Sequence, residues 1–199
     1  KTGSPNLSLN EIMEGLSLQL ITYLLALSKT KDTKDLLPAA MMYIYLHGRP
    51  KSISVPPNGI PHAKEKENTN GIFLNDPDVL RTLDSQSGTD DGFIGVSYVK
   101  DGSVKKTSPV LTAEQFEALK TLTEKILIRL YSRLERGEIA IHPVKNGTLS
   151  PCSYCPYRSI CRFDPALPEN SFDYISKVSD KTIREKLDEE MKRNGKENL

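Results

Sequence analysis

The first clear pattern along the chain is a helical repeat of apolar positions over residues 9–29. Apolar side chains recur there every three or four positions, at Ile12, Met13, Leu16, Leu20, Tyr23, Leu24 and Leu27. This spacing places them on one wide face of a helix. We therefore predict one continuous helix from Leu9 to Lys29, with its apolar face packed on a sheet.

A short apolar run follows, between two polar stretches. Residues 39–46 are apolar and are bounded by Pro38 and Gly48. The run is too short for a typical helix, so it predicts a buried strand. Residues 49–70 are rich in proline and in polar side chains, which indicates an irregular connection.

The middle of the chain carries the signals of a short helix and a hairpin. Asn75-Asp76-Pro77 supplies a cap and a first-turn proline for a helix that ends at Leu83. A polar loop follows over residues 85–92. Residues 93–98 and 104–107 then flank Asp101-Gly102, a turn sequence, and this arrangement predicts a β-hairpin.

Two helices are predicted in the second half. Thr112 and Gln115 form a capping box that opens the longest helix, which should end near Gly137. Residues 180–193 form a strongly charged helix. Its apolar positions are Ile183, Leu187 and Met191. So narrow an apolar face predicts that this helical tail packs weakly.

Composition places the chain among ordinary globular proteins. Of its 199 residues 37% are hydrophobic, and 27 Lys and Arg nearly balance 26 Asp and Glu, which leaves a formal net charge of +1. That balance argues neither for nor against a nucleic-acid partner. No apolar run approaches the roughly 18 residues of a membrane-spanning helix, so we expect no membrane association. The chain starts at Lys1 without a signal-peptide pattern, and we expect further sequence upstream.

Three cysteines lie within ten residues, in the pattern Cys152-x2-Cys155-x5-Cys161. Such clustering favours a local metal site over a spread disulfide framework, and it suits a reducing cytoplasm. Thiolates are soft ligands that bind iron-sulfur clusters or zinc, and the two-residue gap lets one turn aim two sulfurs at one centre. The pattern predicts three ligands of an iron-sulfur cluster, whose fourth ligand comes from elsewhere.

Two other interpretations of these cysteines stay open. His142 would complete a zinc site with the three thiolates, although a lone histidine beside the strand-like residues 139–141 is more often structural. A zinc ribbon would normally add a second Cys-x2-Cys pair. In the other interpretation the cysteines are core residues without metal, which is unusual in a proline-rich polar loop.

Three blocks of sequence, at opposite ends of the chain, carry one resemblance. Residues 137–143, Gly-Glu-Ile-Ala-Ile-His-Pro, precede the cysteine block of residues 150–164. Residues 15–24 contain a Gln-x3-Tyr pattern, and Lys1-Thr2-Gly3 is similar to the end of an Asp-Tyr-Lys-(Ser/Thr)-Gly segment. Together these blocks resemble the carboxyl-terminal end of the AddB family, whose members form the bacterial AddAB (RexAB) helicase-nucleases together with AddA.

The resemblance implies a fold and a set of site residues. The fold would be α/β, a partial restriction-endonuclease-like domain of the PD-(D/E)XK, RecB-like class over residues 1–148. A cluster loop at 149–165 and a helical charged tail at 166–199 would follow. Cys152, Cys155 and Cys161 would bind a 4Fe-4S cluster whose first cysteine lies upstream. The catalytic residues would be Lys1, Gln19 and Tyr23, beside Mg²⁺ whose acidic ligands also lie upstream.

The resemblance also implies an activity and partners. The whole AddB-type protein would be a Mg²⁺-dependent 5'→3' DNA exonuclease, paired as a heterodimer with an AddA-type subunit. The complex would bind double-strand ends and single strands of DNA, and would resect breaks for recombination in the cytoplasm. The chain contains no helicase motor motif, so ATP binding and hydrolysis would reside elsewhere. Without the upstream Mg²⁺ ligands, the 199 residues alone should not cut DNA.

Two alternative functions remain at this point. A stand-alone Cas4-like exonuclease shares the Gln-x3-Tyr pattern and the three-cysteine tail, whereas a zinc-stabilised binding module would have no catalysis. Some basic and aromatic residues are candidates for DNA contact: Lys105, Lys106, Lys145, Arg158, Tyr154 and Tyr157. Each also fits a solvated charge or a packing aromatic.

Overall fold

The structure is a computed structural model that describes residues 7–33, 35–44, 69–89, 92–168 and 170–197. Lys1, the end of the predicted first strand at residues 45–46, and residues 49–68 of the predicted irregular connection lie outside the described residues. The three-part division of the chain at residues 148 and 165 stays a prediction.

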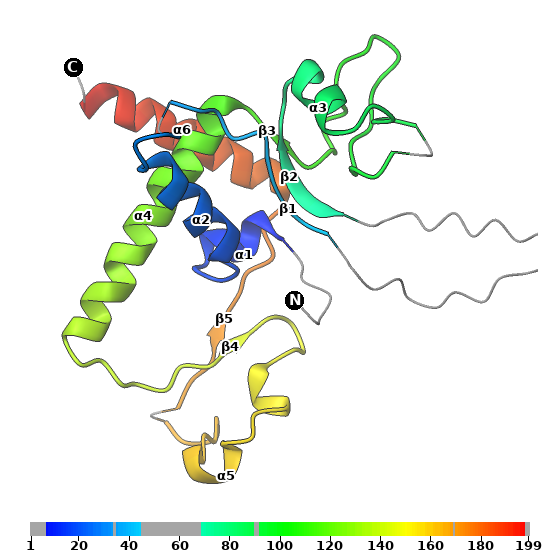
Figure 1. The fold of residues 1–199 in the computed structure, drawn as a ribbon. Coiled ribbons are helices and arrows are strands. Elements are labelled where there is room, and N and C mark those ends of the chain that lie inside the picture. Colours follow the sequence, from blue (N-terminus) through cyan, green and yellow to red (C-terminus); the bar gives the residue numbers. More distant parts are fainter. Residues whose placement is uncertain (1–6, 34, 45–68, 90–91, 169, 198–199) are drawn as a thin grey trace, which may run out of the picture.

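A three-stranded sheet forms the centre of the fold (Figure 1). Its strands are β1 (Ala40–Tyr43), β2 (Asn70–Leu74) and β3 (Val110–Leu111), in the order β1-β2-β3. Strands β1 and β2 are antiparallel, with Ala40 opposite Phe73, and β2 and β3 are parallel, with Phe73 opposite Val110. The apolar pattern predicted β1 but neither β2 nor β3, because each of these presents too few residues for a period to be recognised.

The sheet separates two apolar cores. Because side chains alternate along a strand, Met41, Ile72, Leu74 and Leu111 point to one face, and Ala40, Met42, Phe73 and Val110 to the other. The first face packs against the helices α1, α2, α4 and α6, and the second against α3 and residues 93–104. This layering of helices on a mixed sheet confirms the predicted α/β class.

The predicted helix over residues 9–29 is wrong, because the segment forms two helices. They are α1 (Leu9–Met13) and α2 (Gln19–Ser28). Gly15 has φ +81°, its N–H donates to the Ile12 carbonyl (3.0 Å), and Leu16 N–H donates to the Glu11 carbonyl (2.7 Å). These two bonds are a Schellman cap, which ends a helix through a left-handed residue that glycine adopts without strain.

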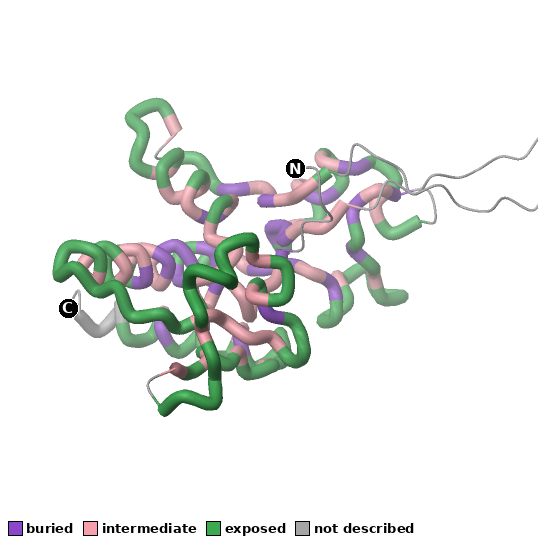
Figure 2. Tube along the Cα trace, turned by 90° about the horizontal axis from the view of Figure 1, so that it is seen from below, coloured by how far each residue is buried: buried purple, intermediate pink, exposed green. Residues whose placement is uncertain are grey.

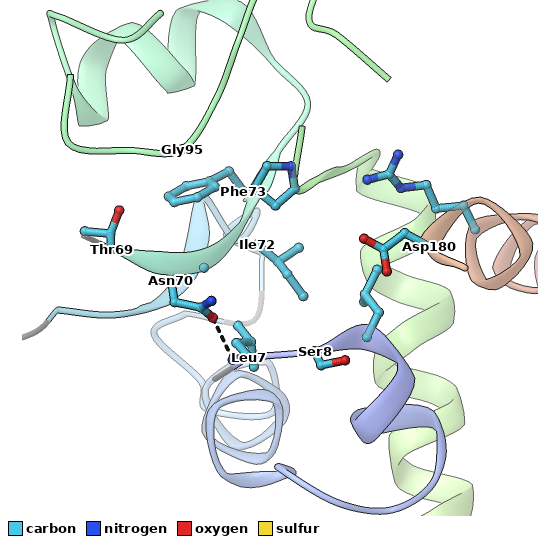
Figure 3. A pocket seen from close by; sticks show the side chains of 12 residues that line it. Leu7, Ser8, Thr69, Asn70, Ile72, Phe73, Gly95 and Asp180 are labelled. Carbon is cyan, nitrogen blue, oxygen red and sulfur yellow. Dashed lines mark hydrogen bonds between the residues drawn. The ribbon is translucent and has the colours of Figure 1, made fainter. Parts of the chain in front are cut away.

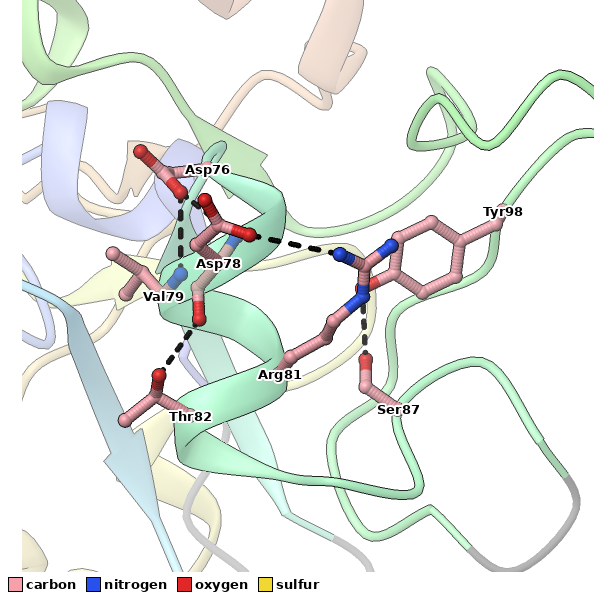
Figure 4. Close-up of polar contacts among 7 residues, drawn as sticks. All are labelled: Asp76, Asp78, Val79, Arg81, Thr82, Ser87 and Tyr98. Carbon is pink, nitrogen blue, oxygen red and sulfur yellow. Dashed lines mark hydrogen bonds and ion pairs between the residues drawn. The ribbon is translucent and has the colours of Figure 1, made fainter.

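The short helix α3 (Pro77–Leu83) forms as predicted, on the face of the sheet opposite α2 (Figure 4). Its cap is Asp76, whose Oδ1 accepts from the backbone N–H groups of Asp78 (2.9 Å) and Val79 (3.1 Å). The loop beyond α3 is tied back by a hydrogen bond between Ser87 and Tyr98, 3.1 Å long.

The predicted hairpin over residues 93–107 is wrong in extent. Only one antiparallel bridge forms, between Tyr98 and Val104. The remaining backbone donors have other acceptors: the buried carboxylate of Asp84 accepts from the N–H groups of Phe93 (2.8 Å) and Ile94 (3.2 Å). Since these N–H groups are already satisfied by a side chain, a longer strand ladder has no donors at this end.

The longest helix, α4 (Ala113–Glu135), confirms the prediction, including both hydrogen bonds of its capping box. Its buried stripe crosses from β3 to the helical core. Beyond residue 135 the chain leaves this core and enters the cysteine segment, the yellow part of Figure 1.

The predicted weak packing of the tail helix is wrong. Helix α6 (Asp180–Glu197) lies along α4, and its Ile183 and Leu187 side chains are 1% and 0% exposed. Polar bonds reinforce the contact, since Gln115 Nε2 donates to Asp188 Oδ1 at 2.8 Å and Lys125 pairs with Glu190. A narrow apolar stripe suffices here because α4 and α1 supply the opposite side of the core. In the described part of the chain, no helix combines the length and apolarity that crossing a membrane requires.

Candidate functional site

Two of the predicted catalytic side chains are in direct contact. Gln19 and Tyr23 lie one turn apart on α2, and Gln19 Nε2 donates a hydrogen bond to the Tyr23 hydroxyl at 2.9 Å. Ile21, on the opposite face, is fully buried, while Tyr23 is 57% exposed. The helix therefore presents a joined amide and phenol to solvent, as the i, i+4 spacing predicts. Lys1 lies outside the described residues.

The helix that carries this pair is held from both sides. It packs against β1 and α4, and Lys29 at its carboxyl end pairs with Glu124 of α4. The aliphatic core beneath it fixes the orientation of the exposed pair. What the pair offers chemically is hydrogen-bond donors and acceptors, which suit a phosphate or a base edge.

The cysteine segment forms a second, separate region. It contains one 3₁₀ turn, η1 (Pro151–Ser153), and one short helix, α5 (Arg158–Cys161), and it lies apart from the central sheet in Figure 1. Ser150 Oγ accepts from the Cys152 N–H at 3.3 Å and so caps the turn that carries the first cysteine. Arg162 ends α5 in a left-handed conformation, with φ +51°.

The donor set of this segment suits a thiolate-bound metal. None of Cys152, Cys155 and Cys161 is in a disulfide; the first two are half-buried and the third is exposed. Among the described residues no group of three histidine, cysteine, aspartate or glutamate side chains is gathered closely enough to hold a metal ion. The residue types fit an iron-sulfur cluster, and ligation would have to draw the sulfurs together, because metal sites of this kind often form only with the metal.

His142, the alternative zinc ligand, is exposed, and its Nδ1 lies 3.2 Å from Ser171 Oγ. The strand-like residues 139–141 beside it do not form a strand, and Ile139 is 90% exposed. The pairing occurs further on, where β4 (Val144–Lys145) runs parallel to β5 (Asp173–Tyr174). Only backbone pairing with a distant segment selects these two residues, which the local pattern does not distinguish.

One ion pair joins the end of α4 to the start of the cysteine segment. Arg133 Nε donates to Glu138 Oε1 at 2.9 Å. This hydrogen bond lowers the pKa of the Glu138 carboxyl and raises the pKa of Arg133, so both directions describe the same contact. Both groups are accessible to solvent, so the pair guides the chain at the helix end and adds little stability.

The candidate DNA-contacting residues fall into two places. The Lys145 amino group lies over two rings, 5.0 Å from the centroid of Phe172 and 5.9 Å from that of Tyr174. Tyr154, Tyr157 and Arg158 are exposed around the cysteines, as Figure 2 shows for most of that segment. Lys105 and Lys106 are also exposed, but they belong to the loop before β3.

Sequence reasoning missed a cleft of about 260 Å³ between the start of the described chain and the start of α6 (Figure 3). Asn70 Oδ1 accepts from the Leu7 N–H at 2.6 Å on one side of it. On the other side Arg184 donates to the carbonyls of Lys106 (2.6 Å) and Ser108 (2.7 Å). Asp180 faces the same cleft, so its lining has both charge signs. No sequence motif marks it, because distant segments build it.

Comparison with known proteins decides the family. The model of the PD-(D/E)XK nuclease superfamily matches residues 1–162, which include both the Gln19–Tyr23 pair and the three cysteines. The chain belongs to this superfamily. Membership in the PD-(D/E)XK superfamily agrees with the α/β layering around the central sheet.

Curated relatives of this PD-(D/E)XK chain share one description, the second subunit of an ATP-dependent helicase/deoxyribonuclease. The relative from Desulforamulus reducens is 32% identical over 190 residues, 92% of this chain and 16% of the relative. Those from Clostridium acetobutylicum and Clostridium kluyveri are 30% and 34% identical and cover 99% and 92% of this chain, which are 18% and 16% of their own lengths. The chain thus spans about a sixth of the length of the relatives it matches.

Proposed function

We propose that this chain is the carboxyl-terminal part of the nuclease domain in an AddB-type subunit of an ATP-dependent helicase-nuclease. The observation that carries the proposal is the continuity of the superfamily match over residues 1–162, through the exposed Gln19–Tyr23 pair and the cysteine loop. The description shared by the relatives adds support, and it favours this assignment over a stand-alone Cas4-like exonuclease.

The proposed reaction is Mg²⁺-dependent hydrolysis of the 5'-ended strand at DNA double-strand breaks, in the 5'→3' direction. The partner in this proposal is an AddA-type subunit, which forms a heterodimer with AddB, and ATP hydrolysis resides outside these 199 residues. The complex acts on chromosomal DNA in the bacterial cytoplasm, where reducing conditions also preserve thiolate ligands. The chain by itself lacks the acidic Mg²⁺ ligands of the motif and is expected to be inactive.

In this proposal Gln19 and Tyr23 position the scissile strand. Their amide and hydroxyl groups are already joined by one hydrogen bond and face solvent, so a phosphate oxygen can accept from the same side of α2 without rearrangement of the helix. Lys1 would stabilise negative charge on the attacking water or on the phosphate. Bound Mg²⁺ would polarise the phosphoryl oxygen and lower the pKa of a water.

The cysteines, in the same proposal, hold a structural 4Fe-4S cluster. Cys152, Cys155 and Cys161 supply three thiolates, and a cysteine in the upstream part of the full-length protein supplies the fourth. Such a cluster would tie the cysteine loop to a distant segment, because both must bind the same centre. Electron transfer is not required for this role.

The decisive experiment measures iron, sulfide and zinc in the full-length protein purified without oxygen, for the wild type and for Cys155→Ala. We expect four irons with matching sulfide in the wild type and loss of most of the iron in the variant, because one of four ligands is gone. Ser153→Ala, two residues away in the same turn, is the matched control and should keep its iron. Stoichiometric zinc without iron in the wild type would instead support the zinc-stabilised module.

The nuclease part of the proposal is tested on the same protein with its partner subunit. Duplex DNA labelled at either the 5' or the 3' end of one strand should lose the 5'-ended strand when Mg²⁺ and ATP are present. Cleavage by the purified 199-residue chain alone would contradict the assignment of the Mg²⁺ ligands to the upstream part.

A further inference from the structure

The two ends of the cysteine loop are joined by a short parallel pairing. Asp173 N–H donates to the Pro143 carbonyl at 3.1 Å, and Ile175 N–H donates to the Lys145 carbonyl at 3.0 Å. These bonds connect β4 and β5 and close residues 146–172 into a loop. All three cysteines lie within this closed loop.

A cluster of rings packs beside that pairing. The rings of Phe163 and Phe172 meet edge to face, with centroids 4.8 Å apart and an interplanar angle of 66°. The rings of Phe172 and Tyr174 follow at 6.1 Å and 67°. The ammonium group of Lys145 lies over the rings of Phe172 and Tyr174. We call these four residues the aromatic latch.

The latch sits close to the third cysteine in sequence. Phe163 follows Cys161 by two residues, so its packing on Phe172 fixes the point where the chain leaves that cysteine. Within the loop the large apolar side chains are exposed: Leu149 is 74% exposed, and Tyr154 and Ile160 are each 80% exposed. They provide little packing of their own, so the latch carries the ordering of the loop's exit.

We propose that the aromatic latch holds the cysteine loop closed in the absence of metal and thereby positions Cys161 for ligation with Cys152 and Cys155. Phe172 is its central residue, because it contacts both other rings and the Lys145 ammonium. These four are positioning residues and do not bind the metal. The inference rests on the proposed metal-binding role of the loop.

The physical reason is the entropy of gathering the ligands. In an open chain, metal binding must restrict every residue between the first and the third cysteine and also the flanking segments. A loop that is already closed has lost part of this freedom before the metal arrives. Binding by the preorganised loop is correspondingly tighter.

The test measures the affinity of the metal-free, full-length protein for Co²⁺, through the visible absorption of thiolate-bound cobalt. Co²⁺ is the probe because it binds thiolates whether the resident metal is iron or zinc. Phe172→Ala should weaken Co²⁺ binding roughly twofold to tenfold, the range that the loss of an edge-to-face ring contact of about 0.5–1.5 kcal/mol represents. Phe172→Tyr keeps the ring and should bind as the wild type does.

Tyr157→Ala is the matched control, because it removes an exposed ring between Cys155 and Cys161. Its Co²⁺ affinity should equal that of the wild type. Lys145→Met is a milder second variant, should Phe172→Ala fail to fold, and it should weaken Co²⁺ binding in the same direction.

The outcomes separate this inference from the proposed function. Equal Co²⁺ affinities of Phe172→Ala and the wild type would overturn the latch even if the wild type carries four irons. An equal loss in Tyr157→Ala would overturn it too, since the effect would then not be specific to the latch. A wild type that contains zinc alone would defeat the cluster and leave the Co²⁺ comparison to decide the latch. A wild type that binds no Co²⁺ would overturn both.

Discussion

At the scale of single residues, Gly15 has the largest consequence for the region around the candidate site. The amino-acid pattern on both sides of it favours one long helix, yet its left-handed conformation ends α1 and lets α2 start in a new direction. Ser17 also has a positive φ, +50°, and its hydroxyl donates to Glu11 Oε2 at 2.7 Å. The direction of the Gln19–Tyr23 pair therefore depends on the turn between the two helices.

Gly15→Ala should destabilise this turn by about 1–2 kcal/mol, the cost of a left-handed conformation for a residue with a Cβ. The added Cβ would also lie 3.4 Å from Ile126 Cγ2. Hydrogen-deuterium exchange of the full-length protein, followed in the peptide that contains α1, should become correspondingly faster. Gly137→Ala, another left-handed glycine with open space around it, serves as a comparison that should leave α1 exchange unchanged.

At the scale of elements, α6 is the helix whose role the sequence understates. Its apolar positions are few, but two of them are fully enclosed by α1 and α4. Its polar positions reach further, since Arg184 binds two carbonyls of the loop before β3. A helix that contacts both the helical layer and that loop is part of the nuclease domain's core and not an appendage.

Leu187→Ala should destabilise the domain by about 2–5 kcal/mol, the usual range for truncating an enclosed leucine. Thermal unfolding of the full-length protein, monitored by exchange in α4 and α6, would measure it. Lys186→Ala on the exposed side of the same helix is the matched control and should change stability by less than about 0.5 kcal/mol. A small effect of Leu187→Ala would restore the weakly packed tail.

At the scale of the whole molecule, the 199 residues separate two tasks in space. The sheet and its helices hold the Gln19–Tyr23 pair, and the loop closed by β4 and β5 holds the cysteines, away from the sheet (Figure 1). This chain covers only 16% of the length of its relatives from Desulforamulus reducens and Clostridium kluyveri. Our proposal accordingly assigns the remaining catalytic ligands and the fourth cysteine to the rest of a larger protein.

Tyr23→Phe should lower strand cleavage by the complete helicase-nuclease about tenfold to a hundredfold, because one hydrogen bond to a charged group contributes about 1.5–3 kcal/mol. Gln19→Ala should have an effect of similar size. Tyr131→Phe, which changes an exposed tyrosine of α4, is the matched control. Nuclease and ATPase rates of the same preparations should be compared, since a loss of both would indicate misfolding and contradict the assigned role.

The sequence alone determined the features that depend on neighbouring residues. The capping box of α4 at Thr112 and Gln115, the capped start of α3 at Asp76, and the contact of Gln19 with Tyr23 all lie within about one helical turn, so local spacing specifies them. The same holds for the clustering of the three cysteines. The resemblance of these blocks to a nuclease family agrees with the superfamily match.

Only the tertiary structure decided the features that depend on residues far apart in the chain. Strands β3, β4 and β5 have two residues each, and they exist because a distant partner accepts their hydrogen bonds. The burial of Leu187 likewise depends on α4 and α1, and the truncated hairpin on the carboxylate of Asp84. A local pattern contains no information about which distant groups will satisfy a backbone donor or cover an apolar side chain, and that choice is made by the packing of the whole molecule.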